Sequence, residues 1–191
     1  MLDLAYGRFK RVICVFMYFV KGLDHIERWV GWVKARYPGI EFVQVLHWNL
    51  SYILRGGLYC VAQPKVKLIK LANVIEAMRL RYGVHYVFLG MKKADGMNRR
   101  LMLNGYADNS YENNGLCYPL AEWTQRDILA YMKQHNLPEP VRYSLKASSG
   151  VGFNLDCMLW LEKNFPQDLE KIYKVFPLSQ RVLWEHHQKQ T

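Results

Sequence analysis

The sequence lacks an apolar run of the roughly 20 residues that a membrane-spanning helix needs. The apolar stretch at residues 12–20 is too short to cross a bilayer, and no small-residue cleavage site follows it, as one would in a signal peptide. This stretch is typical of a buried strand. We therefore expect a cytoplasmic protein that makes no use of a membrane.

The sequence also lacks a recognisable metal-binding or redox motif. Its four cysteines, Cys14, Cys60, Cys117 and Cys157, are far apart, so no Cys-x-x-Cys pair exists. The neighbouring histidines at positions 186 and 187 do not have the i, i+4 spacing that places two ligands on one helix face. We expect no metal, these residues indicate no particular cofactor, and we expect the thiols in loop-like contexts, Cys60 and Cys117, to be unreactive.

Acidic side chains are scarce. The chain of 191 residues has 16 Asp and Glu against 26 Lys and Arg, which gives a formal net charge of +10. This surplus indicates an anionic partner, which can be a nucleotide, a nucleic acid or an acidic protein. The hydrophobic fraction of 51% excludes general disorder and suffices for a substantial core.

The order of apolar runs and helical patterns predicts an α/β fold. Short runs rich in strand-forming residues occupy positions 11–19, 41–46 and 86–89, and segments with helical periodicity lie between them, including one at 65–81. This alternation is typical of an open, mostly parallel sheet flanked by helices. We predict such a domain over residues 1–140 and a helical extension, packed on it, over residues 141–191.

A cluster of cations follows the third predicted strand. Gly90 ends the strand, and Lys92, Lys93, Arg99 and Arg100 follow it closely. Ligands of open α/β sheets bind just beyond the carboxyl ends of the strands, and glycine lets backbone N–H groups approach an anion. The alternative is an ordinary solvated loop. We hypothesise that these five residues form a phosphate- or sulfate-binding site.

Two further residues are weaker candidates for ligand contacts. His47 directly follows the strand predicted at 41–46, although a structural histidine is the simpler interpretation. Arg55 precedes Gly56 and Gly57 in a stretch with the character of a turn, which is either part of a ligand loop or a plain connection.

Two stretches resemble the phosphoadenosine-phosphosulfate (PAPS) reductase family of the adenine nucleotide alpha-hydrolase-like superfamily. Residues 90–99, Gly-Met-Lys-Lys-Ala-Asp-Gly-Met-Asn-Arg, look like the family's Gly-x-Arg segment with a second Arg seven residues on. Lys92 takes the place of the first Arg, and Arg99 matches the second. Residues 118–128, Tyr-Pro-Leu-Ala-Glu-Trp-Thr-Gln-Arg-Asp-Ile, look like the Pro-Leu-x-x-Trp-Thr segment that opens a helix, and they add Trp123 to the candidates.

The resemblance implies a function. It implies an adenine nucleotide alpha-hydrolase-like fold that binds an adenine nucleotide or sulfonucleotide, with ATP or PAPS as the substrate. The chemistry would be sulfotransfer and reduction, or reaction at the nucleotide α-phosphate, so that the chain would be an oxidoreductase or a nucleotidyl- or sulfur-transferring enzyme of sulfur metabolism. Lys92 and Arg99 would neutralise the anionic group, with Lys93 and Arg100 in support.

The sequence departs from this family in three places. The Ser-Gly-Gly-x-Asp-Ser pyrophosphate loop does not occur, and residues 1–6 look like the tail of the helix that would follow it. The acidic motif after the second strand and the Cys-containing C-terminal segment that supplies the nucleophile do not occur either. Thiol-based reduction by this chain alone is therefore not expected. The alternatives are a nucleic-acid-associated basic protein and a non-catalytic interaction subunit, either of which could be a homo-oligomer.

Overall fold

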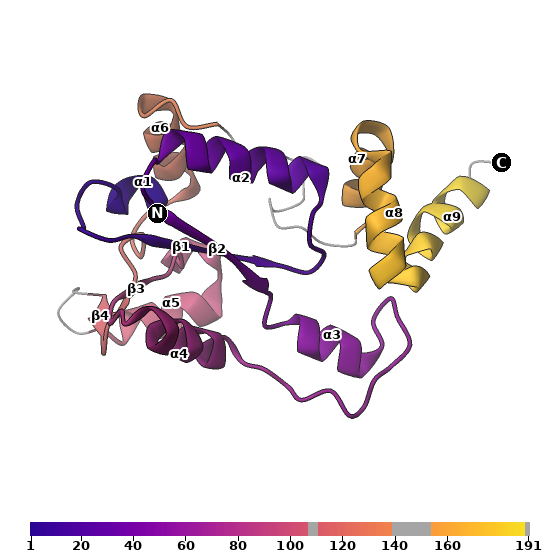
Figure 1. Ribbon diagram of the computed structural model, residues 1–191, viewed down its shortest axis with the longest axis horizontal. Helices are drawn as coiled ribbons and strands as arrows, with labels where there is room; N and C mark the ends of the chain where they lie inside the picture. Colours follow the sequence, from indigo (N-terminus) through magenta and orange to yellow (C-terminus); the bar gives the residue numbers. More distant parts are fainter. Residues whose placement is uncertain (107–110, 139–153, 190–191) are drawn as a thin grey trace. The chain divides into compact units, whose positions relative to one another are not determined.

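The computed structural model describes residues 1–106, 111–138 and 154–189 (Figure 1). The chain folds as two compact units. Unit 1 consists of Met1–Lys10 and Ala72–Pro140, and unit 2 consists of Arg11–Leu71 and Val141–Thr191. Residues 11–71 are thus grouped with the C-terminal helices, whereas the predicted division at residue 140 grouped them with unit 1. No helix of the described ranges has both the length and the apolar character needed to span a membrane.

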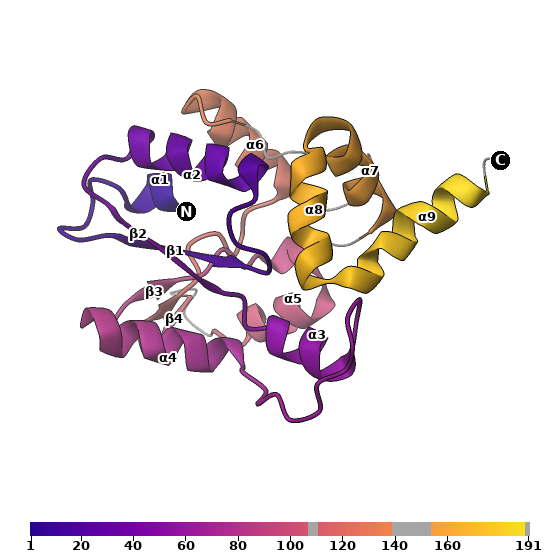
Figure 2. The ribbon, with the colours of Figure 1, turned by 45° about the vertical axis from the view of Figure 1, so that its right-hand side comes forward.

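Unit 2 begins with a strand–helix–strand unit. β1 (Ile13–Tyr18) and β2 (Glu41–Leu46) pair in parallel, with Ile13 opposite Glu41 and Tyr18 opposite Leu46. The crossover is α2 (Asp24–Arg36), which covers one face of the pair in both ribbon views (Figures 1 and 2). Four of the six residues of β1 and three of the six of β2 are β-branched or aromatic, and such side chains pack well on a pleated surface. The predicted parallel pairing of these two segments is confirmed.

The rest of unit 2 is helical. α3 (Leu50–Gly56) follows β2, and its C-cap Gly57 has a φ of +74°, where a Cβ would come within 2.9 Å of the Ala62 Cβ. The C-terminal elements are α7 (Leu155–Asn164), α8 (Pro166–Val175), the 3-10 turn η2 (Pro177–Ser179) and α9 (Gln180–Gln188). The prediction of a helical C-terminal part is confirmed for these described segments.

The core of unit 2 joins two segments that lie far apart in the sequence. Its buried side chains from the N-terminal segment are Val20, Leu23, Ile53 and Cys60. Those from the C-terminal helices are Cys157, Met158, Leu161, Leu169, Ile172, Phe176 and Leu183. Neither segment can therefore bury its apolar residues without the other.

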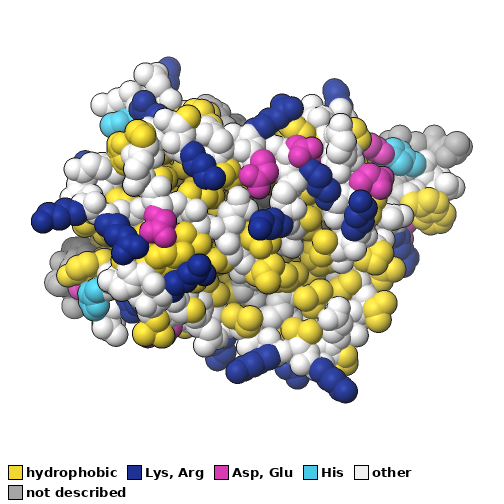
Figure 3. All heavy atoms as spheres, in the orientation of Figure 1, with side chains coloured by type: hydrophobic (Ala, Val, Ile, Leu, Met, Phe, Trp, Pro, Cys, Tyr) yellow, Lys and Arg dark blue, Asp and Glu magenta, His cyan; other side chains and the backbone are white. Residues whose placement is uncertain are grey.

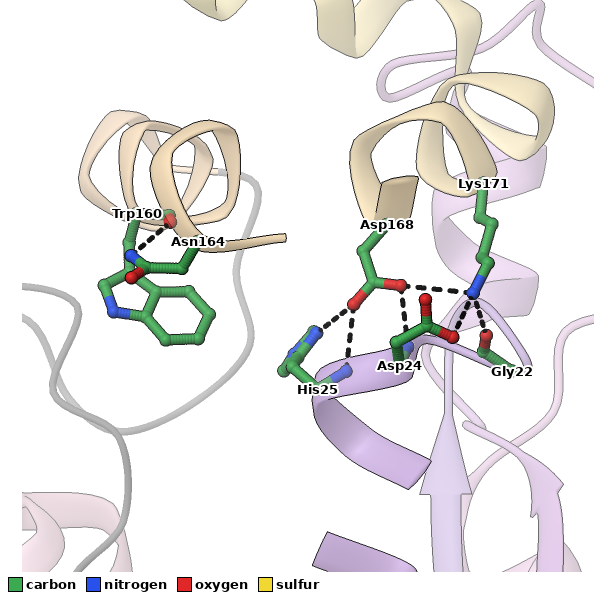
Figure 4. A network of polar contacts seen from close by, with 7 residues as sticks. All are labelled: Gly22, Asp24, His25, Trp160, Asn164, Asp168 and Lys171. Carbon is green, nitrogen blue, oxygen red and sulfur yellow. Dashed lines mark hydrogen bonds and ion pairs between the residues drawn. The ribbon is translucent and has the colours of Figure 1, made fainter. Parts of the chain in front are cut away.

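A polar contact also joins these segments, as Figure 4 shows. The carboxylate of Asp168, on the first turn of α8, accepts hydrogen bonds from the backbone N–H groups of Asp24 (2.6 Å) and His25 (3.0 Å) at the start of α2. Nδ1 of His25 lies 2.7 Å from the same carboxylate, and the two side chains are 3% and 0% exposed. The N-cap residue of α2, Leu23, has no side-chain acceptor. Asp168 therefore caps α2 from another helix.

Unit 1 holds a second, smaller sheet. Its helices are α1 (Leu2–Ala5), α4 (Leu71–Tyr82, whose first residue belongs to unit 2), α5 (Met97–Asn104) and α6 (Gln125–Gln134). β3 (Val87–Phe88) pairs in parallel with β5 (Leu116–Cys117), and β5 pairs antiparallel with β4 (Glu112–Asn113). Its core cluster consists of the buried residues Leu103, Tyr111, Tyr118 and Ala121.

Two sequence-based predictions need correction. We expected residues 86–89 to join the same sheet as β1 and β2, but the described strands form two sheets, and the parallel partner of β3 is β5. A two-residue strand such as β5 carries no readable alternation in sequence. We also expected a helix from residue 65, but α4 begins at Leu71. The Ile69 N–H instead donates to the Ser51 hydroxyl (2.9 Å), so this segment bonds to α3 and not to a helical turn of its own.

Candidate anion-binding site

The basic loop, residues 90–100, starts directly beyond β3. The Leu89 N–H donates to the Cys117 carbonyl (2.9 Å), which continues the β3–β5 ladder up to Gly90. The loop then forms the short 3-10 turn η1 (Lys93–Asp95) and enters α5 through Gly96. Gly96 has φ +151° and ψ +170°, a conformation essentially restricted to glycine. Gly96 is thus the single residue that connects the 3-10 turn to α5.

Asp95 draws together two cations of the loop. Its carboxylate contacts the Lys92 ammonium, accepts the Lys92 backbone N–H (3.0 Å) and lies 3.6 Å from Nη1 of Arg99. Burial acts to raise the pKa of Asp95, but the contacts with Lys92 and the charge of Arg99 outweigh it and lower this pKa. Asp95 is therefore ionised near neutral pH and occupies the space between the two cations.

Lys93 ties the loop to a distant segment. Its backbone N–H donates to the Ala121 carbonyl (2.8 Å), and its ammonium donates to the Glu122 carboxylate (2.6 Å) and the Tyr111 hydroxyl (3.0 Å). The Tyr111 hydroxyl also contacts Glu122, and the ammonium lies 5.1 Å from the centre of the Tyr111 ring. These hydrogen bonds raise the pKa of Lys93 and lower the pKa of Glu122, so both are charged.

Two arginines occupy the first turn of α5. Arg99 is 47% exposed, and Arg100 is exposed and makes no ion pair with any described residue. The first turn of α5 carries no acidic residue, and its N-cap Gly96 offers no side chain to the N–H groups there. Arg99 and Arg100 lie at the positive end of the α5 dipole, which is electrostatically unfavourable. An anion bound there would reduce this repulsion. The electrostatics of this turn thus favour an anion.

Trp123 belongs to the segment that Lys93 holds. It lies one residue after Glu122 and directly before Thr124, the N-cap of α6, whose hydroxyl accepts the Asp127 N–H (3.3 Å). This capping box starts the helix that the Pro-Leu-x-x-Trp-Thr segment was expected to open. The Trp123 ring lies 5.4 Å from the Tyr131 ring, and the Tyr131 ring stacks on His135 at 4.0 Å. The partly exposed Trp123 side chain therefore lies on the segment of unit 1 that is hydrogen-bonded to Lys93 of the basic loop.

The other two candidates belong to unit 2. Nδ1 of His47 accepts the Asn49 N–H (3.1 Å), and its ring stacks on Phe19 at 4.6 Å. Burial lowers the pKa of His47, so the ring is neutral at pH 7. Arg55 lies exposed in the last turn of α3. His47 and Arg55 therefore belong to a surface of unit 2 and not to the basic loop.

Sequence reasoning located the cations and the opposing Asp95 but missed Glu122 and Tyr111, the partners of Lys93. Asp95 stands three residues from Lys92, a spacing that could have indicated the pair. Glu122 and Tyr111 are separated from Lys93 by 29 and 18 residues, and nothing in the sequence indicates that they meet. Within the described residues, no group of three or more His, Cys, Asp or Glu side chains is arranged to hold a metal ion.

Comparisons with known proteins give no relative for this chain. No protein-family model matches the sequence, and no match was found among the curated proteins or the solved structures.

Proposed function

We propose that unit 1 binds an adenine nucleotide or a sulfonucleotide, such as ATP or PAPS, and that the chain is a PAPS-reductase-like protein with an adenine nucleotide alpha-hydrolase-like fold. The observation that carries the proposal is the position of Lys92, Lys93 and Arg99 on one loop, directly beyond the carboxyl end of a parallel strand. Ligands of open α/β sheets bind at such ends. A cytoplasmic location goes with this proposal, because these nucleotides are substrates there.

The loop suits the charged part of the ligand. Arg99 can hold two oxygens of a phosphate or sulfate at once, whereas Lys92 acts as a point charge. In sulfotransfer or in reaction at the α-phosphate, these cations would stabilise the negative charge that develops on the departing group. Asp95 would have to yield its place between them, since its carboxylate contacts both. Trp123 would offer a flat face to the adenine ring.

Calorimetry with ADP, ATP and PAPS tests the proposal. Arg99→Ala should weaken binding roughly 10- to 150-fold, because a charge-assisted hydrogen bond contributes about 1.5–3 kcal/mol. Lys92→Arg should bind as well as the unmodified chain. The matched control is Arg126→Ala, which removes an exposed arginine of the same unit outside the loop. If none of the three ligands binds the unmodified chain, or if both arginine variants lose the same affinity, the proposal is wrong.

A further inference from the structure

Unit 2 contains a long stretch without acidic residues. No Asp or Glu occurs between Glu41 and Glu76, whereas Arg55, Lys65, Lys67 and Lys70 all fall inside this stretch. Arg55, Lys65 and Lys67 are exposed, and none of the three forms an ion pair with a described residue. In Figure 3, Lys and Arg side chains but no Asp or Glu side chains appear around the region of α3 and the coil that follows it.

Residues 63–69, which carry Lys65 and Lys67, are hydrogen-bonded to α3. The Gln63 N–H donates to the Leu54 carbonyl (2.9 Å), and the Ile69 N–H donates to the Ser51 hydroxyl (2.9 Å). Residues 63–69 are therefore attached near both ends to the same helix. This attachment keeps Lys65 and Lys67 beside the helix that carries Arg55.

A row of aromatic rings leads to the same helix from the strand ends. Phe19 follows β1, His47 and Trp48 follow β2, and Tyr52 lies on α3. The ring centres are 4.6 Å apart for Phe19 and His47, 5.5 Å for His47 and Trp48, and 5.9 Å for Trp48 and Tyr52. The row begins against the core with Phe19 and ends with Tyr52, which is 37% exposed. Its outer end is thus a ring that a planar ligand can reach.

We propose that this surface of unit 2 binds single-stranded nucleic acid, with Arg55, Lys65 and Lys67 on the phosphates and Tyr52 against a base. Proteins that bind single strands combine a cationic track along the backbone with aromatic side chains on which bases stack. The absence of carboxylates over the stretch 42–75 suits a polyanion of any sequence, because the attraction comes from the phosphates. The proposal involves residues of unit 2 alone and does not depend on nucleotide binding by unit 1.

An anionic membrane surface is the competing occupant. Four aliphatic side chains near the lysines, Leu58, Val61, Leu68 and Ile69, are between 37% and 78% exposed and could enter a lipid headgroup layer. The aromatic row favours nucleic acid, since it ends in Tyr52, a partly exposed ring held edge-to-face by Trp48 on which a base can stack, whereas a headgroup layer needs no such ring. Phosphatidylserine vesicles therefore form the second arm of the test.

The charge test measures fluorescence anisotropy of labelled oligo(dT) and oligo(U) across a range of salt concentrations, with the full chain. Lys65→Gln combined with Lys67→Gln should weaken binding and reduce the slope of log K against log salt by about 1.4, which corresponds to roughly 0.7 for each phosphate that is no longer neutralised. The control, Lys163→Gln combined with Lys174→Gln, removes the same charge from exposed positions on α7 and α8. An equal loss in both double variants would overturn the proposal, because binding would then follow net charge.

The stacking test uses Tyr52. Tyr52→Ala should lower the affinity for the oligonucleotides roughly 5- to 150-fold, whereas Tyr52→Phe, which keeps the ring, should lower it little. Arg99→Ala should leave oligonucleotide affinity unchanged, which separates this site from the one proposed in unit 1. If Tyr52→Ala binds as well as the unmodified chain, or if the lysine variant loses vesicle binding but not oligonucleotide binding, the proposal is wrong.

Discussion

At the scale of single residues, Asp95 controls how much positive charge the basic loop offers. It contacts Lys92 and Arg99 together, so Asp95→Asn removes the carboxylate that an incoming anion must displace. We expect the affinity for ADP to rise about 2- to 5-fold, because partly exposed ion pairs of this kind contribute up to about 1 kcal/mol. Calorimetry measures the change.

The matched control is Asp156→Asn, which removes an exposed acid from α7 in the other unit. A general effect of net charge would raise the affinity equally in both variants. If Asp95→Asn instead weakens binding, then Asp95 positions Lys92 and Arg99 for the ligand and does not compete with it.

A second residue-scale prediction concerns Cys117. Burial raises the pKa of its thiol, and the nearby charge of Glu112 raises it further, against a smaller lowering by Arg79. Since only the thiolate is nucleophilic, iodoacetamide should alkylate Cys117 more slowly at pH 7 than it alkylates free cysteine. Mass spectrometry after timed quenching gives the rate, and Cys117→Ser assigns it. Rapid alkylation at pH 6 would show a low-pKa thiol and contradict the prediction.

Only part of the candidate site could be predicted from the sequence. The cations are readable because they crowd behind an apolar run that ends in Gly90. The neutralisation of Lys93 is not readable, because Glu122 reaches it across 29 residues and depends on how residues 118–124 fold back. A charge pattern thus predicts where an anion could bind, whereas the charge that is available there depends on the tertiary structure.

At the scale of elements, local signals predicted some boundaries well. Asp127 stands three residues after Thr124, and this spacing indicates the start of α6 because the capping hydrogen bonds lie within one turn. The helix expected from residue 65 begins only at Leu71, because the Ser51 hydroxyl bonds the backbone at Ile69. A contact from another element decided that boundary, and no local pattern could show it.

The start of α2 depends on such a contact as well. Asp168 on α8 accepts two backbone N–H groups of α2 and contacts the His25 ring. We expect Asp168→Asn to lower the free energy of unfolding by at least about 1.5–3 kcal/mol at pH 7, because a hydrogen bond to a charged group contributes about that much and Asn keeps only one acceptor oxygen. Urea unfolding followed by circular dichroism measures it. Glu170→Gln, at an exposed position of α8, is the control and should change stability little.

The effect should depend on pH. Burial acts to raise the pKa of Asp168, but hydrogen bonds from His25, Asp24 and Lys171 outweigh it and hold this pKa below its usual value. A carboxyl group with a lowered folded-state pKa stabilises the protein fully above its unfolded-state pKa of about 3.9, and this stabilisation is lost as the pH falls through the folded-state value. The difference between the unmodified chain and Asp168→Asn should therefore shrink as the pH falls below about 4. A difference that grows on acidification would contradict this assignment.

At the scale of the whole molecule, the alternation of apolar runs with helical periods predicted a mixed α/β chain with parallel pairing of β1 and β2. It could not predict which segments share a core. Amphipathic patterns show that α7, α8 and α9 each have an apolar side but not which surface covers it. Packing of Met158, Leu161 and Phe176 with Leu23 and Ile53 decides this, and these residues lie more than a hundred positions apart in the sequence.

This shared core leads to a prediction about truncation. If the two units describe the fold correctly, residues 1–140 should not form a complete domain without the C-terminal helices. A chain ending at Pro140 loses seven of the eleven buried residues of the unit 2 core and exposes Val20, Leu23, Ile53 and Cys60. Each such side chain contributes about 1.5–3 kcal/mol when buried, against a total stability of about 5–15 kcal/mol for a domain. Hydrogen exchange should therefore show that β1, α2 and β2 lose protection in the truncated chain, whereas α5 and α6 keep theirs. Addition of a peptide covering residues 141–191 should restore protection. If β1 and β2 stay protected without it, residues 1–140 fold as a domain of their own.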